Sequence, residues 1–250
     1  MLPITAVIIS HNEADRIGAC VSSVIDIVDE VLVIDSHSND NTAQIAEELG
    51  AIVKVVDWKG YGGSKNYGNA LAKNDWILSL DCDEICSVEL QKELLALDLN
   101  RDVVYQIDRH NYYLGNRVMY SGWSPDWVLR LFHREISSWN DNAVHEKLRS
   151  TSVVEYQKLE GHLIHHSYRS ERDHKLKTEK YAQLKAKSWI DQGKSPGWLK
   201  FFFGAGFKAF HSYIIKGGFR DGNTGWKIAK MNAYLVRCQL RSYRNLIKEL

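Results

Sequence analysis

The run Asp81-Cys82-Asp83-Glu84, which directly follows the apolar segment WILSL, combines residue types that could bind a cation. In an extended chain alternate side chains share one face, so Asp81 and Asp83 are predicted to point the same way. Paired carboxylates suit a hard divalent cation, Mg²⁺ or Mn²⁺, whose other ligands are commonly waters and phosphate oxygens. The same run could instead be an acidic turn that caps the following helix.

Two further polar segments also follow apolar runs. Asp35 ends the run VLVID and opens the segment DSHSNDNT, where its carboxylate could bind a base or a ribose, whereas Asp40 or Asn41 could cap a helix. The glycine-rich segment GYGGSKN carries Lys65, and its backbone N–H groups and this cation could meet a phosphate. It is not a Walker loop, because the pattern GxxxxGKS or GxxxxGKT is absent.

The elements that must position these residues alternate between strand and helix over the first 110 residues. Continuous apolar runs predict buried strands, and apolar residues at helical spacing predict helices. The predicted strands are residues 4–10, 31–35, 52–57, 76–81 and 103–108, and the predicted helices are residues 13–28, 41–49, 63–72 and 88–97. This order predicts an α/β fold with a mostly parallel, doubly wound sheet. Such sheets bind ligands at the carboxyl ends of their strands, so the polar residues 10–13, 35–39 and 81–84, each just after a predicted strand, are expected at one edge.

Length and composition exclude several classes of protein. The chain has 250 residues, of which 44% are hydrophobic and 25% charged, as is typical of a globular protein. Four cysteines without a CxxC pair exclude a disulfide scaffold and argue against a zinc knuckle. We expect neither a signal peptide nor a membrane-spanning helix, because every apolar stretch is soon interrupted by polar residues.

The net charge of +1 hides an uneven distribution along the chain. Residues 191–250 contain 11 Lys or Arg and 3 Asp or Glu, so they carry +8, and the preceding residues carry −7. Helices are predicted at residues 170–190 and 224–247, with an aromatic segment punctuated by lysines at 198–216. This basic region suggests an anionic partner, a membrane surface or a nucleic acid, although it could also be a set of helices that cover the sheet.

Four segments occur in the order and spacing of the family 2 glycosyltransferases of the GT-A fold: IISHNEADRI, VLVIDSHSNDNT, GGSKNYGNA and WILSLDCDE. Four later segments resemble a narrower group that contains the bacterial lipopolysaccharide inner-core β-1,4-glucosyltransferases: GWSPDWVLRLFHR, NAVHEKL, HLIHHSYRS and YIIKGGFRDGNTGW. The resemblance implies a Rossmann-like GT-A domain at residues 1–168, with a nucleotide-sugar half at 1–110 and an acceptor half at 111–168. A basic amphipathic helical extension at residues 169–250, which could associate with a membrane, would follow.

The resemblance also assigns roles at the nucleotide-sugar site. Asp35 would bind the uracil base, Asp81 would face the ribose and the metal, and Asp83 would bind the metal, Mg²⁺ or Mn²⁺. The other residues that would hold the nucleotide are Ser10, His11, Asn12, Glu13 and Lys65. The segment DSHSND departs from the usual DDGSTD of the family and lacks its second carboxylate, so only Asp35 is carried over from it.

On the acceptor side, the resemblance assigns the general base to Glu146, with Asp126 as its rival. Glu146 could otherwise form a surface ion pair. Arg130 could neutralise phosphate or acceptor charge, or it could form a structural salt bridge. His165 could complete the metal site or touch the diphosphate, or it could merely be hydrogen-bonded beside the core.

The combined expectation is an inverting, metal-dependent transferase that moves a sugar, glucose, from a UDP-sugar to an inner-core heptose of lipopolysaccharide. One base suffices because the diphosphate leaves readily, whereas a glycoside hydrolase needs two carboxylates. The expected location is cytoplasmic, at the inner face of the bacterial inner membrane, with an anionic membrane surface and no nucleic acid as partner. The alternatives are a polyprenyl-phosphate glycosyltransferase, a nucleic-acid-binding protein that uses the basic region, and an inactive nucleotide-binding scaffold.

Overall fold

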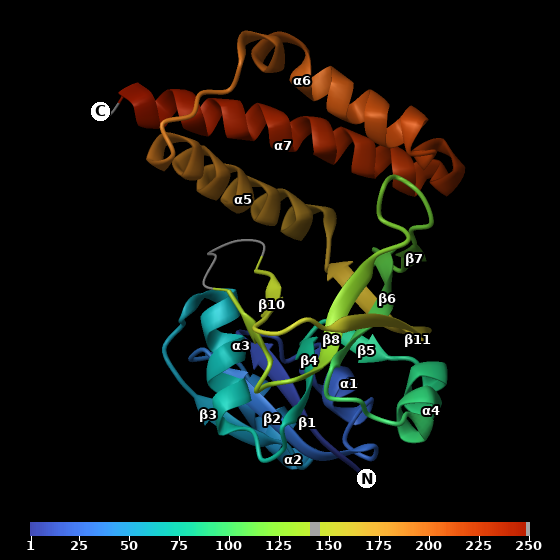
Figure 1. Cartoon of the computed structure of the whole chain (residues 1–250). Helices are drawn as coiled ribbons and strands as arrows, with labels where there is room; N and C mark the ends of the chain where they lie inside the picture. The colour runs from blue at the N-terminus through green and yellow to red at the C-terminus, as the bar shows by residue number, and fades with distance from the viewer. Residues whose placement is uncertain (141–145, 249–250) are drawn as a thin grey trace. The chain divides into compact units, whose positions relative to one another are not determined.

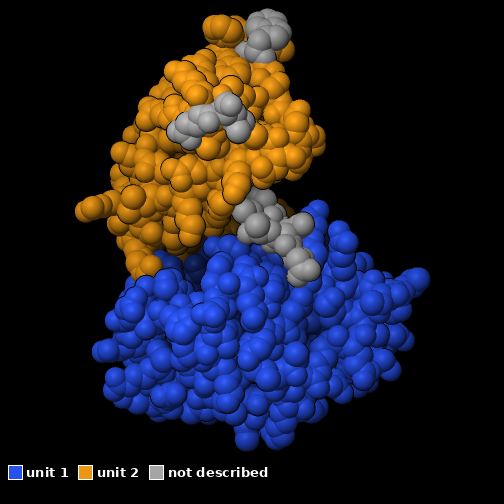
Figure 2. Space-filling view, turned by 90° about the vertical axis from the view of Figure 1, so that its left-hand side faces the viewer, with its two compact units in different colours: residues 1–110, 126–165 blue, residues 111–125, 166–250 orange. Residues whose placement is uncertain are grey.

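The structure is a computed structural model that describes residues 1–140 and 146–248. The chain forms two compact units (Figure 2). The first comprises Met1–His110 and Asp126–His165, and the second comprises Asn111–Pro125 and His166–Leu250. The division at residue 168 and the two halves expected within residues 1–168 stay predictions.

Parallel strands form one side of the sheet in the first unit (Figure 1). Their order is β3-β2-β1-β4, and each neighbouring pair is parallel. The strands are β1 (Leu2–Ser10), β2 (Val28–Asp35), β3 (Ile52–Val55) and β4 (Trp76–Asp81). Ser10 pairs in register with Asp35, and Ile9 pairs with Asp81, so the polar residues that end these strands lie at one edge.

Antiparallel strands continue the sheet beyond β4 in the order β8-β6-β11-β5. They are β8 (Trp127–His133), β6 (Val103–Tyr113), β11 (Glu155–Tyr168) and β5 (Glu84–Cys86), and β7 (Asn116–Arg117) pairs with β6. A separate antiparallel pair consists of β9 (Ser137–Trp139) and β10 (Leu148–Ser150). The structure thus confirms the predicted α/β class, with a parallel sheet that carries the polar edge and a C-terminal helical extension.

The helices of the first unit are α1 (Ile17–Ser22), α2 (Thr42–Glu48), α3 (Gly60–Leu71) and α4 (Val88–Ala96). The helix predicted at residues 13–28 is wrong in its extent, because the chain leaves the helix after Ser22 and enters turns. Val24, Ile27 and Val28 enter the core from these turns and from the start of β2, which produces apolar spacing without a helix. The strand predicted at 103–108 is longer than expected and runs to Tyr113.

Alternate residues of β1 pack on opposite faces of the sheet, as the two-residue period of a strand requires. Ile4, Ala6 and Ile8 belong to one hydrophobic cluster, and Val7 and Ile9 belong to another.

Helix α3 covers the face of β1 and β2 at short range because of Gly68. A Cβ atom at Gly68 would lie 2.5 Å from Cγ1 of Val7 and 2.9 Å from Cγ1 of Ile34. This close approach fixes the height of α3 above the sheet, and Lys65 lies one turn earlier on the same helix.

The second unit is mainly helical. Helix α7 packs against both α5 and α6 (Figure 1). The helices are α5 (Glu171–Asp191), α6 (Trp198–Phe210), the π-helix η1 (His211–Ile215), the 3-10 helix η2 (Gly218–Asp221) and α7 (Gly222–Lys248). In the part of the chain that the structure describes, no helix combines the length and the apolar character needed to cross a bilayer.

His174 on α5 is a buried titratable group of the second unit. Its ring stacks on Tyr168 with centroids 3.9 Å apart, and its Nδ1 lies 3.2 Å from the hydroxyl of Tyr113. Burial lowers the pKa of His174 from 6.5 to about 4, so the folded chain holds this ring neutral.

We predict that His174 contributes to stability in a pH-dependent way. Below pH 6.5 the unfolded chain binds a proton at His174, whereas the folded chain binds one only near pH 4. The stabilisation is therefore complete above pH 6.5 and is lost as the pH falls toward 4, by up to about 3 kcal/mol. Unfolding free energies measured in urea between pH 7 and 4 should fall less steeply for His174→Phe than for the wild type. Equal slopes would contradict the assignment, and His37→Phe, at an exposed histidine, is the control.

Candidate functional site

The carboxyl ends of β1 and β2 are joined through a buried carboxylate. Asp35 is 1% exposed, and its carboxylate accepts hydrogen bonds from the Oγ of Ser10 at 3.0 Å and from the backbone N–H of Ser38 at 2.8 Å. The three polar groups therefore hold the two loops that follow β1 and β2 against each other.

The loop after β1 is tied to the loop after β2 at each of its predicted nucleotide-binding residues. The hydrogen bonds join His11 Nδ1 to the Ser36 carbonyl (2.7 Å), Asn12 N–H to Ser38 Oγ (2.8 Å), Asn39 N–H to Asn12 Oδ1 (2.7 Å) and Glu13 N–H to Thr42 Oγ1 (2.8 Å). Asn12 and His37 have positive φ angles of 55° and 53°, which turn the chain sharply after each strand. The structure thus brings Ser10, His11, Asn12, Glu13 and Asp35 together at one edge.

An open hollow of about 380 Å³ lies beside this edge. It is lined by His37, Val55, Val56, Asp57, Lys59 and Tyr67. The backbone N–H of Val56 donates to the carbonyl of Asp35 at 2.9 Å, so the hollow adjoins the end of β2. Its lining combines an aromatic ring, a histidine and a lysine, which are groups able to contact a planar base and an anionic group.

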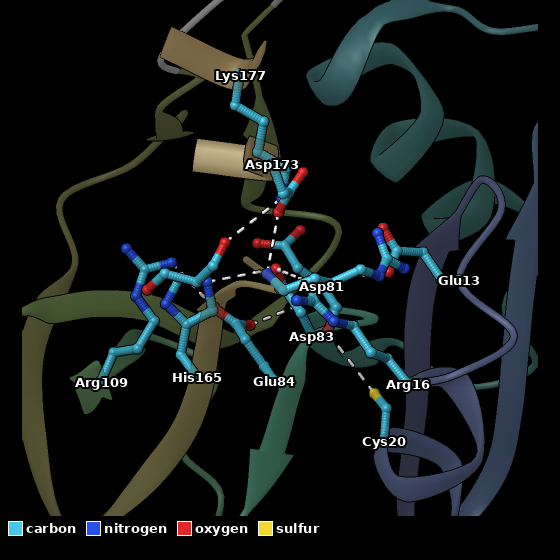
Figure 3. Close-up of polar contacts among 12 residues, drawn as sticks. Glu13, Arg16, Cys20, Asp81, Asp83, Glu84, Arg109, His165, Asp173 and Lys177 are labelled. Carbon is cyan, nitrogen blue, oxygen red and sulfur yellow. Dashed lines mark hydrogen bonds and ion pairs between the residues drawn. The ribbon is translucent and has the colours of Figure 1, made fainter. Parts of the chain in front are cut away.

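Each polar group of Asp81, the last residue of β4, has a partner in the protein. Its two carboxylate oxygens contact Lys65 Nζ at 2.9 Å and an Arg130 guanidinium nitrogen at 2.6 Å. Its backbone N–H donates a hydrogen bond to Oε2 of Glu84 at 3.1 Å, and its carbonyl oxygen accepts one from the thiol of Cys20 at 3.6 Å (Figure 3). Lys65 is 1% exposed and the side chain of Asp81 is 28% exposed, so the ion pair is buried on the side of the lysine and half-buried on the side of the carboxylate.

The two cations keep Asp81 ionised. Burial alone would raise the pKa of this carboxyl, but the charges of Lys65 and Arg130 outweigh burial and lower the pKa well below its usual range. In return, Glu84 and Asp81 outweigh the effect of burial on Arg130 and raise the pKa of its guanidinium.

Glu84 forms the centre of a second set of ion pairs behind Asp81. It is fully buried, and one carboxylate oxygen accepts from Arg130 at 2.5 Å and from Arg109 at 3.1 Å. Arg109 also contacts Asp126 at 2.9 Å. Arg130 is thus part of a structural salt bridge, and Asp126 is connected to Asp81 through alternating cations and carboxylates.

Asp83 lies in a turn and not in an extended strand. The expectation that Asp81 and Asp83 share one face of an extended segment is wrong, because Cys82 and Asp83 form a turn between β4 and β5. The turn points Asp83 to a different set of partners from those of Asp81.

The partners of Asp83 are a histidine and an arginine (Figure 3). Its Oδ2 lies 3.4 Å from Nε2 of His165 and 3.5 Å from Nη1 of Arg16. Burial would raise the pKa of Asp83, but the hydrogen bond and charge of His165 and the charge of Arg16 lower it.

The residues that could hold a divalent cation are Asp83 and His165. A carboxylate oxygen and an imidazole nitrogen at this separation can both turn toward one ion, and both are ligands that Mn²⁺ accepts. Among residues 1–140 and 146–248, no group of three or more His, Cys, Asp or Glu side chains is gathered for a metal. A cation bound here would take its other ligands from waters and substrate phosphates, as Mg²⁺ and Mn²⁺ commonly do. Asp83 and His165 therefore fit a divalent cation as two of its ligands, and the carboxylate of Asp81 is paired with Lys65 and Arg130.

Glu146 lies at the same edge of the sheet through Lys65. Its Oε1 contacts Lys65 Nζ at 2.9 Å, so a single ammonium bridges Glu146 and Asp81. The ring of Trp139 lies 4.8 Å from that ammonium. The part of the predicted motif NAVHEKL that precedes Glu146, residues 142–145, lies outside the described residues.

The sequence analysis missed three residues that hold the site together. Glu84 was noted only as the end of the acidic run, and Arg109 and Trp139 were not singled out. The signal available for Glu84 was its place directly before the apolar residues Ile85 and Cys86, which indicates a return to the core. Arg109 and Trp139 come from strands distant in the sequence, so no local pattern points to them.

The chain matches the family model described as glycosyl transferase family 2 over residues 5–162. It is 32% identical over 258 residues to a Rickettsia bellii protein named as an uncharacterized glycosyltransferase, which covers 97% of this chain and 86% of the relative. It is 28% identical over 239 residues to the lipopolysaccharide core biosynthesis glycosyltransferase LpsC of Rhizobium meliloti, covering 90% of this chain and 86% of the relative. Among solved structures, S. aureus TarS 1–349 in complex with UDP-GlcNAc is 13% identical, with a TM-score of 0.47 over 98% of this chain and 92% of that chain.

We predict that Glu84→Gln destabilises the chain strongly although it barely changes the shape of the side chain. The substitution removes the charge that compensates Arg130 and Arg109, and loss of one partner of a buried pair costs about 3–5 kcal/mol. Glu135→Gln is the matched control, because Glu135 pairs with Arg101 at the surface, where a pair contributes about 0–1 kcal/mol. Urea unfolding compares the two variants, and equal losses of unfolding free energy would show that the Glu84 pairs are unimportant.

Proposed function

The chain belongs to glycosyltransferase family 2, and from that premise we propose that it is an inverting transferase that moves a sugar from a UDP-sugar to a lipopolysaccharide core acceptor. The observation that carries the proposal is the bridge that Lys65 makes between Asp81 and Glu146. It places the end of a parallel strand, where α/β sheets bind ligands, next to a second carboxylate able to act as a base.

The donor is proposed to bind across the ends of β1, β2 and β4. Asp35, with Ser10 and the loop from His11 to Glu13, would hold the nucleoside, and the adjoining hollow offers space for the base. Lys65 would offset phosphate charge close to Asp81, and Arg130, paired with Asp81 and Glu84, would hold the carboxylate of Asp81 in place. Glucose is the proposed sugar, on the resemblance to the inner-core glucosyltransferases.

A divalent cation, Mg²⁺ or Mn²⁺, is proposed to be held by Asp83 and His165. When bound, it would stabilise the negative charge that develops on the departing diphosphate. Asp81 would act as a positioning residue at the ribose side, because its carboxylate is already paired with Lys65 and Arg130.

Glu146 is proposed as the general base. The acceptor hydroxyl oxygen would form a bond to the anomeric carbon while the bond from that carbon to the diphosphate oxygen breaks. The bonding electrons leave with UDP, and the hydroxyl proton passes to the carboxylate of Glu146. Lys65 contacts Glu146 at 2.9 Å and would hold that carboxylate in place. Asp126 is the rival base, and its carboxylate is bound by Arg109 at 2.9 Å.

The acceptor is proposed to be an inner-core heptose. The support for this class of acceptor is the similarity to LpsC along 90% of the chain. Such an acceptor is lipid-linked, so the proposed place of action is the inner face of the bacterial inner membrane.

We predict that Glu146→Gln retains binding of UDP and Mn²⁺ but lowers the turnover of transfer by roughly 10²–10⁴-fold, because the hydroxyl proton loses its acceptor. The assay follows transfer of radiolabelled sugar from UDP-glucose to lipopolysaccharide truncated at the heptose, with UDP binding measured in parallel by calorimetry.

Asp126→Asn is the matched comparison, since it also neutralises a carboxylate within the ion-pair network. It should retain more transfer than Glu146→Gln. The reverse order, with Asp126→Asn inactive and Glu146→Gln active, would move the base to Asp126. Wild-type turnover in Glu146→Gln would remove Glu146 from the mechanism.

A further inference from the structure

Helix α6 and the π-helix η1 present large apolar side chains to solvent. The residues, 46–77% exposed, are Leu199, Phe202, Phe203, Phe207, Phe210, Ile214 and Ile215. We refer to these seven residues as the α6 face. So many large exposed apolar side chains on two successive helical segments indicate an interaction site.

The opposite side of α6 is the side that packs within the second unit. A Cβ atom at Gly204 would lie 3.3 Å from Cγ1 of Val236 on α7. Phe201 lies under the guanidinium of Arg244, at 4.7 Å. Helix α6 therefore already packs against α7 (Figure 1). The α6 face is additional to this packed side.

The charged residues of the segment that carries the α6 face have one sign. Residues 192–220 contain five Lys or Arg and neither Asp nor Glu. Lys208 and Lys216 are exposed, and Lys200 lies over the ring of Trp189 at 4.3 Å. Asp221 is the next carboxylate along the chain. It accepts hydrogen bonds from the backbone N–H groups of Met119 and Tyr120, so its side chain is held against residues 119 and 120.

Apolar side chains on a segment whose only charged residues are cations suit an anionic lipid surface. Phe and Leu side chains enter the boundary between headgroups and acyl chains, and lysines beside them meet lipid phosphates. A second copy of this chain would bring cation against cation across a two-fold axis, which opposes self-association. A nucleic acid would use aromatic rings for stacking, but Leu199, Ile214 and Ile215 cannot stack on bases.

We propose that the α6 face docks the protein on the surface of an anionic phospholipid bilayer, with the Phe side chains in the interfacial layer and Lys208 and Lys216 at the phosphates. The helix lies in the plane of the surface and does not span it. This inference rests on the second unit alone and is independent of the donor site.

The test is sedimentation of the full chain with vesicles of phosphatidylcholine alone and of phosphatidylcholine mixed with phosphatidylglycerol. The wild type should bind the mixed vesicles, and binding should weaken as salt is raised. Phe203→Ser combined with Phe207→Ser should reduce affinity at least roughly tenfold through lost apolar burial. Lys208→Gln combined with Lys216→Gln should reduce binding to the mixed vesicles by roughly tenfold.

The matched control is Tyr156→Ser combined with Leu176→Ser, which removes two apolar side chains of similar exposure that belong to β11 and α5 and not to α6 or η1. It should bind like the wild type, and all variants should share the wild-type unfolding midpoint because the changes are at the surface. Failure of the wild type to bind the mixed vesicles, or unchanged binding of the Phe variant, would overturn the proposal. Sedimentation as a dimer that the Phe variant abolishes, without vesicle binding, would assign the face to a second copy instead.

Discussion

The buried ion pairs of Asp81 are the constraint on which the site depends. A carboxylate at the end of a central parallel strand would be costly to bury alone, and Lys65 and Arg130 make its burial possible. Each cation is shared with a second carboxylate, Glu146 for Lys65 and Glu84 for Arg130. Residues from α3, β4, β5, β8 and the segment before β10 are therefore fixed relative to one another by these charge pairs.

The fold supplies the short distances that these pairs need. Gly68 allows α3 to lie close to Val7 and Ile34, and Lys65, one turn earlier, then reaches the end of β4. The parallel register of β1 with β2 and β4 brings Ser10, Asp35 and Asp81 to the same edge. Because the chain turns after β4, the acidic residues that follow have different partners. Asp81 and Glu84 pair with lysine and arginine side chains, whereas Asp83 contacts His165.

Local patterns predicted the parallel strands and the edge where the polar loops meet, because buried runs such as VLVID and WILSL carry their own signal. The same patterns failed at residues 13–28, where turns bury Val24 and Ile27 at helix-like spacing. They also could not show that Asp81 is paired on both oxygens, since Lys65 and Arg130 come from α3 and β8, and only tertiary packing brings them together. For the same reason, no local sequence pattern indicated Arg109 or Trp139. The roles of Glu146, Asp126 and His165 stay predictions, supported by their placement around this network.

The measurement that tests the central claim most directly is calorimetric titration of UDP, with and without Mn²⁺, into the wild type and Asp83→Ala. If Asp83 and His165 hold the cation while Asp81 stays paired with Lys65 and Arg130, Mn²⁺ should strengthen UDP binding to the wild type. Asp83→Ala should lose that enhancement and keep the weaker, metal-independent binding. Absence of UDP binding to the folded wild type under both conditions would contradict the account of the donor site.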